Sequence, residues 1–503
     1  MLRNIASNWV LTAIAVVSAY LLLPFTVDKL GREAYGVWLL VASVTGYLRL
    51  LSLGAPMTSV RYVARATTQR GSGVDGPHED LNEVVGTFLG LYLLMALASI
   101  LVGAALLFLL PILFDVPVHH LALAQLCLVI VVFNIALGFV QQLPYGVMAG
   151  HHDFIPRNLI LGGASVFKLV LTLVALTLYP SILVLACVQS VGLLFEMLAC
   201  VYVMARRYPN LKISLRYFQK GMLKGVFSFS IYVMLLQVGM QLAFETDSLV
   251  IGAKIGVAEI PYFTVANSLP LYFMEFLIAV AAVVMPKATE LHHRGDAEGL
   301  RAMFLIWSKI SLSLTLLGGL YLMIVGPRII AWWIGPEFEG PSGMVLTLLM
   351  GSYLIFLPIR AVAQPILMGI GKPRSPTVAF ILCGLLNLIL SLALAGPYGL
   401  AGVAWGTAIP NVIFAVAMLQ MTCKEIGQPL GGFVSYVVPK AAIGALPIAC
   451  ALWWSVEKFQ VRSFVELAAT GIASALLMAF IWVLFVYRHD RFVDPMTLLR
   501  RRG

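Results

Sequence analysis

Residues 86–110 read GTFLGLYLLMALASILVGAALLFLL, a run of 25 residues without a charged side chain. A helix needs about 20 mostly apolar residues to cross the hydrocarbon core of a bilayer. Comparable runs recur at 158–178, 181–204, 305–325 and 464–487. In lipid every backbone polar group must bond internally, and these runs are too long and too uniformly apolar for barrel strands, so they predict transmembrane helices.

The composition of the whole chain agrees with a membrane protein. Of its 503 residues, 61% are hydrophobic and only 11% are charged, and the mean hydropathy is +0.95. A soluble domain carries roughly 25% charged residues. The net charge of +10 does not indicate a nucleic-acid partner, because the basic residues are spread over many short loops and form no domain.

The apolar runs predict an all-α integral membrane protein with about fourteen transmembrane helices. We expect them at 8–26, 36–56, 86–110, 121–141, 158–178, 181–204, 226–246, 262–286, 305–325, 342–362, 378–396, 399–421, 441–456 and 464–487.

The distribution of lysine and arginine predicts the orientation of these helices. With the N-terminus inside, 24 of the 33 basic residues fall in inner segments and 6 in outer loops. The other three, Arg49, Lys168 and Lys309, lie within helices. Positive charge collects on the cytoplasmic side of membrane proteins, so both termini are expected in the cytoplasm. An even number of spans satisfies this expectation.

Weak internal repeats divide the chain into two halves. Lys29-Leu30-Gly31 after the first span is matched by 254–256 after the seventh, and Pro144…Gly150…Pro156 is matched by 365–376. Similar offsets, and an even number of spans between them, predict two parallel-related six-helix lobes around a central cavity, followed by two C-terminal helices. The expected parts are an N-terminal lobe at 1–205, a cytoplasmic amphipathic linker at 206–225, a C-terminal lobe at 226–422, and the last two helices with a basic tail at 423–503.

The linker mixes basic and apolar residues. Arg216, Lys220 and Lys224 are spaced by four, which predicts one basic face of an interfacial helix lying on anionic lipid.

No motif for catalysis or cofactor binding occurs in the chain. The segment 369–372 (GIGK) is followed by proline and lacks the phosphate-binding pattern of a P-loop. The six cysteines lie in or beside apolar runs without metal spacing, and the pair 151–152 before Asp153 is expected to be a solvated turn. We therefore expect no enzyme activity, no cofactor and no metal site.

Charged residues within the spans are the main candidates for function, because a charge near the bilayer centre costs about 2.5–3.5 kcal/mol on insertion scales. Several have polar neighbours at helical spacing, such as the set 237, 241 and 245 and the set 165, 168 and 172. Such stripes indicate a water-filled cavity, although interhelical hydrogen bonding and snorkelling are the alternative explanation. Lys309 is close enough to the inner face to snorkel.

Two groups of candidates follow. The candidates for substrate binding in the cavity are Arg49, Lys168, Asn8, Gln237, Gln241, Asn267 and Arg360. The candidates for ion coupling are Glu275, Asp247 and Glu196.

Two stretches resemble a known family. LPFTVDKLGREAYGVWLLVASVTGYLRLLSLGAPMTSVRYVA (23–64) is similar to the opening of bacterial polysaccharide flippases, the Wzx-type O-antigen and exopolysaccharide transporters of the multidrug/oligosaccharidyl-lipid/polysaccharide (MOP) exporter superfamily. FETDSLVIGAKIGVAEIPYFTVANSL (244–269) resembles the start of their second lobe.

This resemblance implies alternating access, and export of an undecaprenyl-diphosphate-linked oligosaccharide from the cytoplasmic to the periplasmic leaflet of the bacterial inner membrane. It also implies basic cavity residues that meet the diphosphate, a role that suits Arg49. Membrane lipids, H⁺ or Na⁺, and a polysaccharide polymerase are the other expected partners.

Two other functions remain open. An ion-coupled exporter of amphipathic cations shares the fold, and Glu275 keeps that alternative open. An integral-membrane polymerase or ligase is the third, but such enzymes are expected to carry a large outer loop, and the longest one here is only about 326–341.

Overall fold

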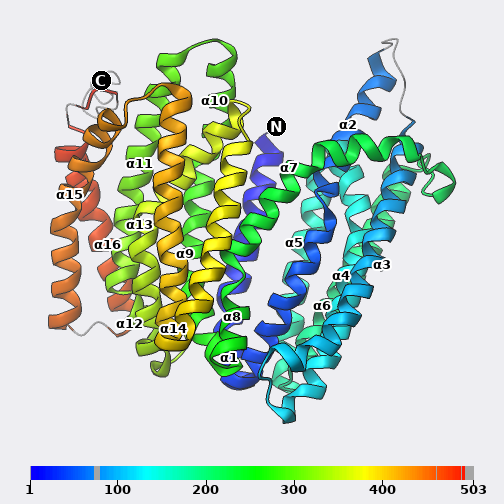
Figure 1. The fold of residues 1–503 in the computed structure, drawn as a ribbon, viewed down its shortest axis with the longest axis horizontal. Helices are drawn as coiled ribbons and strands as arrows, with labels where there is room; N and C mark the ends of the chain where they lie inside the picture. Colours follow the sequence, from blue (N-terminus) through cyan, green and yellow to red (C-terminus); the bar gives the residue numbers. More distant parts are fainter. Residues whose placement is uncertain (1, 73–79, 460–461, 489, 493–503) are drawn as a thin grey trace. The chain divides into compact units, whose positions relative to one another are not determined.

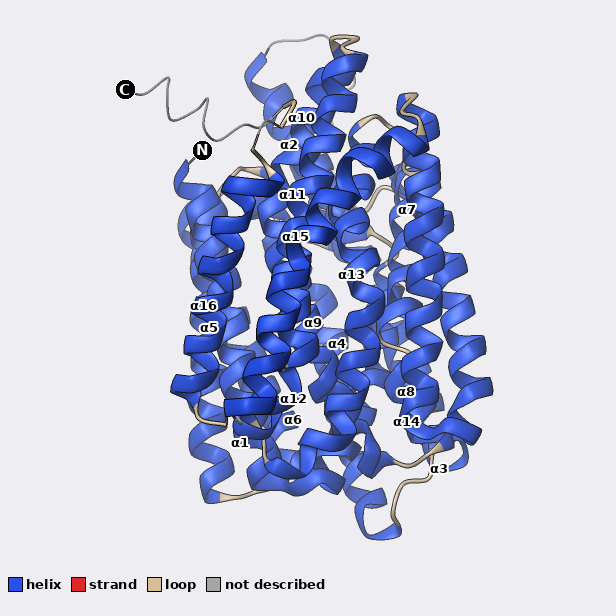
Figure 2. Cartoon of the chain, turned by 90° about the vertical axis from the view of Figure 1, so that its left-hand side faces the viewer, coloured by secondary structure: helices blue, strands red, loops and turns tan. Residues whose placement is uncertain are grey.

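The computed structural model describes residues 2–72, 80–459, 462–488 and 490–492, and every regular element in these residues is helical (Figure 2). The chain divides into two compact units, Met1–Val238 with Gly256–Pro261, and Gly239–Ile255 with Tyr262–Gly503. The boundary falls within α7 (Lys220–Phe244).

Unit 1 contains the helices of the first half of the chain (Figure 1). They are α1 (Leu2–Gly46), η1 (Tyr47–Ser52), α2 (Ala55–Ser72), α3 (Leu81–Leu113), α4 (Val118–Gly150), α5 (Phe154–Leu178), α6 (Ile182–Arg207), η2 (Leu215–Tyr217), most of α7, and η3 (Val257–Glu259).

Unit 2 contains the end of α7 and the remaining helices. They are α8 (Asp247–Lys254), α9 (Ile260–Val280), η4 (Ala281–Val283), α10 (Val284–His293), α11 (Ala297–Ile324), α12 (Gly326–Trp333), η5 (Pro336–Phe338), α13 (Glu339–Gly369), α14 (Arg374–Ile426), α15 (Leu430–Phe459), α16 (Phe464–Ile481) and η6 (Trp482–Val486).

Eleven helical stretches in the described residues are long and apolar enough to cross a membrane. Two of them, Val10–Thr68 and Arg374–Ile426, have 59 and 53 residues, enough for two crossings each at about 1.5 Å per residue. They bend at Gly31 and Gly399, where the backbone leaves helical angles. With α7 as a further span, the structure agrees with the predicted all-α class and about fourteen helices.

The boundaries of the second span differ from the prediction of 36–56. The helix continues to Gly46, a 3-10 segment follows, and a new helix begins at Ala55. The break occurs because Leu53 and Gly54 take left-handed φ angles of 49° and 74°, which an α-helix does not allow.

The repeated motifs have similar conformations in the two units. Gly31 and Gly256 both combine a positive φ (74° and 140°) with an extended ψ (167° and 152°), a region that only glycine enters readily. In the turns after α4 and α13, the amides of Asp153 and Lys372 each donate to the carbonyl five residues earlier, both at 2.8 Å. The two matches support the predicted internal repeat.

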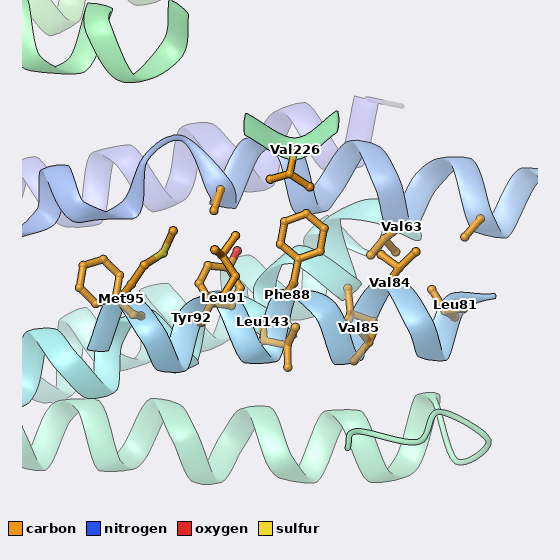
Figure 3. Packing of buried hydrophobic residues seen from close by; sticks show 14 of the residues in the cluster. Val63, Leu81, Val84, Val85, Phe88, Leu91, Tyr92, Met95, Leu143 and Val226 are labelled. Carbon is orange, nitrogen blue, oxygen red and sulfur yellow. The ribbon is translucent and has the colours of Figure 1, made fainter. Parts of the chain in front are cut away.

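The core of unit 1 lies between α2, α3 and α4 (Figure 3). Phe88 and Tyr92 of α3 are almost fully buried, and the Tyr92 hydroxyl donates to Ser59 Oγ at 3.2 Å. Apolar burial gives little drive in lipid, so helix pairs depend on close packing of this kind. Gly150 of α4 allows such an approach, because a Cβ there would lie 2.4 Å from the Val63 side chain.

Within unit 2, a buried ion pair joins α11 to the segment that follows the two C-terminal helices. Lys309 of α11 pairs with Asp490, which follows the last helix, and each side chain is only 2% exposed. The Tyr436 hydroxyl of α15 donates to the same carboxylate at 2.6 Å. The prediction that Lys309 snorkels to the inner face is therefore wrong, because its charge is neutralised inside the protein.

The segment 208–219 does not form the predicted interfacial helix. It contains one short 3-10 turn, η2, and α7 begins at Lys220, so Arg216 and Lys220 do not share a continuous helical face. Its backbone bonds to α3 instead, where Asn82 Oδ1 accepts from the Lys212 amide at 2.9 Å. Such side chain–backbone bonds compete with a regular helix.

Candidate functional site

A buried carboxylate lies at the start of α8 in unit 2. Both oxygens of Asp247 accept from the Thr407 hydroxyl at 3.0 Å, and Asn387 Nδ2 donates to that hydroxyl at 3.0 Å. All three side chains are at most 3% exposed. Asn387 and Thr407 lie on opposite sides of the Gly399 bend, so both halves of α14 reach Asp247. A carboxylate with further oxygen donors inside the protein is an environment suited to a proton or a hard cation.

The sequence interpretation named Asp247 but missed Asn387 and Thr407. Each has a polar neighbour four residues later, Ser391 and Asn411, and this spacing on an apolar helix was the signal that could have found them. Their contact with Asp247 spans 140 and 160 residues of sequence and depends on the tertiary fold.

Arg360 of α13 is buried among apolar groups. Its guanidinium carbon lies 5.2 Å from the ring centroid of Phe244, 5.7 Å from Phe380 and 5.9 Å from Phe356, which are cation–π distances. A guanidinium NH group donates to the sulfur of Met274, but within the described residues Nε has no hydrogen-bond partner. The arginine therefore retains unused capacity to bind an acceptor.

Two further titratable residues of unit 2, Tyr353 and Glu275, lie close to Arg360. Tyr353, whose buried hydroxyl has no hydrogen-bond partner among the described residues, interacts electrostatically with Asp247 and Arg360. Glu275 of α9 interacts electrostatically with Arg360. The side chain of Glu275 is exposed, and its role in ion coupling stays a prediction. A short 3-10 turn, η4, joins α9 to α10 beyond Glu275.

Two of the candidates in unit 1, Lys168 and Glu196, form an ion pair. Lys168 Nζ of α5 lies 3.1 Å from Glu196 Oε1 of α6, and the Tyr145 hydroxyl donates to Glu196 Oε2 at 2.9 Å. The neighbouring hydroxyls of Ser165 and Thr172 donate to the backbone of their own helix. The predicted polar stripe on α5 is thus satisfied locally and does not require a cavity.

Arg49 lies in the 3-10 segment η1, and its side chain is exposed. Within the part of the chain that the structure describes, it makes no ion pair, whereas Lys168 and Lys309 are paired with carboxylates. The break at Leu53 and Gly54 ends the helix just beyond Arg49 and leaves it on the surface of unit 1.

The remaining candidates are dispersed. Gln237 is exposed and Gln241 is half-buried on α7, and the Oδ1 atom of Asn267 on α9 is buried without a partner among the described residues. The side chain of Asn8 lies outside what the structure describes. The role of these four residues in substrate binding stays a prediction.

Comparison with known protein families identifies the family of this chain. The family described as "Polysaccharide biosynthesis protein" matches residues 1–292, more than half of the chain. The chain belongs to this family. The resemblance drawn from 23–64 and 244–269 is confirmed.

A curated relative of this family member is an uncharacterized membrane protein, EpsK, of Bacillus subtilis (strain 168). The two are 23% identical over 512 residues, which cover 97% of this chain and 96% of the relative. The chain is accordingly a membrane protein similar to EpsK along its whole length.

Solved structures share the fold. An inward-facing multidrug resistance MATE family transporter of the MOP superfamily is 18% identical, with a TM-score of 0.69, and the match covers 83% of this chain and 98% of that one. The lipid II flippase MurJ in an inward closed conformation is 16% identical, also with a TM-score of 0.69, and covers 96% and 99%. At these identities the similarity establishes the MOP-type fold alone.

Proposed function

We propose that this protein is a flippase that moves an undecaprenyl-diphosphate-linked oligosaccharide from the cytoplasmic to the outer leaflet of the bacterial inner membrane by alternating access. The product would enter O-antigen, exopolysaccharide or capsule synthesis, where a polymerase would consume it. Membership of the polysaccharide biosynthesis family supports this proposal, and so does a fold shared with a lipid II flippase.

The observation that carries the proposal is that only some of the basic residues within the spans form ion pairs. Lys168 and Lys309 are neutralised by carboxylates, whereas Arg49 and Arg360 have no ion pair among the described residues. A guanidinium presents a planar set of donors that matches phosphate oxygens. Two arginines without an ion pair in the described part of the chain therefore favour an anionic cargo such as a diphosphate, although Arg360 has an acid nearby in Glu275.

The direction of transport agrees with the energetics of such a cargo. Outward movement of negative charge is favoured by an inside-negative potential, by about 2.3 kcal/mol per charge per 100 mV. The chain therefore needs no nucleotide-driven step to move a diphosphate outward. We expect both termini in the cytoplasm, as the positive-inside count predicts.

Ion coupling is the second part of the proposal, and we assign it to Asp247 with Thr407 and Asn387. The carboxylate is buried with only neutral donors around it, so a proton or Na⁺ would neutralise it at a modest desolvation cost. Thr407 and Asn387 lie on opposite sides of the bend in α14, so loss of the ion would alter contacts that join its two halves.

An ion-coupled exporter of amphipathic cations is the alternative. The observation that favours it is the exposed acid Glu275 on α9, which could attract a cation. Glu275 already interacts with Arg360, which reduces its net attraction for a cation.

Deletion of the gene in its native host separates the two functions. We expect labelled lipid-linked oligosaccharide to accumulate on the cytoplasmic face, where an added glycosidase cannot reach it in intact spheroplasts. Drug sensitivity should stay unchanged. If the sugar remains accessible from outside and the strain becomes sensitive to cationic drugs, the exporter function is correct and the flippase proposal fails.

A further inference from the structure

Adjacent histidines occur three times in the chain, at 119–120, 151–152 and 292–293. Imidazole is a common ligand of transition metals, so each pair offers two ligands of a metal site. The described residues contain one group whose ligand atoms converge, and it combines the first pair with Glu33.

In each of the other two pairs, one histidine points its Nδ1 atom at a carbonyl of its own helix. The Nδ1 atom of His151 lies 2.9 Å from the Val147 carbonyl, and its ring packs on Tyr208 with centroids 4.7 Å apart. The Nδ1 atom of His293 lies 2.9 Å from the Thr289 carbonyl.

The acid beside the third pair is also engaged. Glu290 is held by Lys287 at 2.9 Å and by Arg294 at 3.0 Å. This leaves the first pair as the one whose side chains face a carboxylate rather than their own helix.

The fold brings Glu33 to this pair from a distant part of the chain. Glu33 follows the bend of α1 at Gly31, and His119 and His120 occupy the first turn of α4, which begins at Val118. The His119 Nε2 and Glu33 Oε1 atoms are 3.3 Å apart, and the two imidazole centroids are 4.2 Å apart. One ligand atom from each of the three residues lies within 4.8 Å of the others.

These distances suit a tetrahedral metal ion. Zinc binds histidine nitrogen and carboxylate oxygen at about 2.0–2.2 Å, so neighbouring ligand atoms in a tetrahedron are about 3.4 Å apart. The separation of 3.3 Å between Nε2 and Oε1 matches that edge, although it is slightly long for an N–H···O hydrogen bond. Small rotations of the exposed side chains would bring the third ligand to the same distance.

We propose that Glu33, His119 and His120 form a binding site for one transition-metal ion, best matched by Zn²⁺, with water as the fourth ligand. The charge of Lys29, four residues before Glu33 on α1, is offset by Asp28 at 3.5 Å, so it opposes the cation only weakly. The ion would join the part of α1 beyond the Gly31 bend to the start of α4, and would restrain movement at that bend.

Metal binding is measured directly on the purified full-length protein, prepared without a histidine tag and treated with a chelator. Titration with ZnCl₂ by calorimetry should show one ion bound per chain. Glu33→Gln, His119→Ala and His120→Ala should each weaken binding by about tenfold or more, because three ligands leave little redundancy. The matched control, His292→Ala with His293→Ala, should bind zinc like the wild type.

Thermal unfolding checks that the variants are folded and gives a second readout. Without zinc the three variants should unfold at the wild-type temperature, because the side chains are partly exposed. Zinc should raise the unfolding temperature of the wild type and of the control, but not that of the variants. Absence of zinc binding by the wild type, or equal affinity in His119→Ala, would overturn the proposal in favour of a histidine–glutamate ion pair alone.

Discussion

Removal of the ammonium group at Lys309 is the sharpest test of how the C-terminal helices are held. The Lys309→Met substitution keeps the length of the stem and leaves Asp490 charged in a site where it is 2% exposed. Asp490 would retain two donors, the Tyr436 hydroxyl at 2.6 Å and the Phe492 amide at 3.0 Å. Breaking a buried ion pair from one side costs about 3–5 kcal/mol, and the retained donors place our expectation near 3 kcal/mol.

Lys309 also contributes cation–π contacts. Its Nζ atom lies 4.7 Å and 5.2 Å from the ring centroids of Tyr436 and Tyr487. Loss of these contacts also lowers the stability of Lys309→Met, and this part of the loss does not depend on Asp490. The double variant with Asp490→Asn removes both charges, and it should therefore recover about half of the lost stability.

Equilibrium unfolding of the detergent-solubilised protein measures this cycle. Lys287→Met is the matched control, because Lys287 forms an exposed pair with Glu290 whose loss should cost at most about 1 kcal/mol. If Lys309→Met costs no more than this control, or if the effects of the two charge changes simply add, the buried pair does not fasten the C-terminal helices.

Two further predictions concern packing and coupling. Gly36→Ala would place a Cβ 2.0 Å from the Val257 carbonyl oxygen. It should therefore destabilise the protein by about 1–3 kcal/mol, as measured by thermal unfolding. The control Gly138→Ala has open space around the new Cβ and should be neutral or slightly stabilising. Equal unfolding temperatures would refute the close approach. Asp247→Asn should abolish the response of transport to proton or sodium gradients in vesicles while leaving the protein folded; an unchanged response would exclude Asp247 as the coupling site.

The helices and their number were predictable because length and hydropathy alone define a transmembrane helix. The repeat was predictable in part, since Gly31 and Gly256 carry a backbone conformation that few other residues adopt. The boundary of the second span was missed, because Gly54 and Pro56 mark only a local break in a long apolar run and a left-handed φ at a leucine such as Leu53 is uncommon.

The partners of the charged residues could not be predicted from the sequence. Lys168 and Glu196 are 28 residues apart and lie on neighbouring helices, but Lys309 and Asp490 are 181 residues apart. Helical spacing shows which residues share a face of one helix, and it does not show which helix packs against that face. The same limit applies to Glu33, whose histidine neighbours lie in another helix of unit 1.

The most direct test of the central claim is the rate at which the reconstituted protein exposes a labelled polyprenyl-diphosphate oligosaccharide on the far leaflet of vesicles. Arg49→Ala and Arg360→Met are the variants to compare. Arg360 is buried without an ion pair among the described residues, and Glu275, which interacts with it, is itself exposed, so an apolar side chain of similar length should leave the protein folded. We predict that the wild type exposes the sugar faster than protein-free vesicles and that both variants lose most of this rate while remaining folded. Exposure by the wild type at the rate of protein-free vesicles would contradict the account.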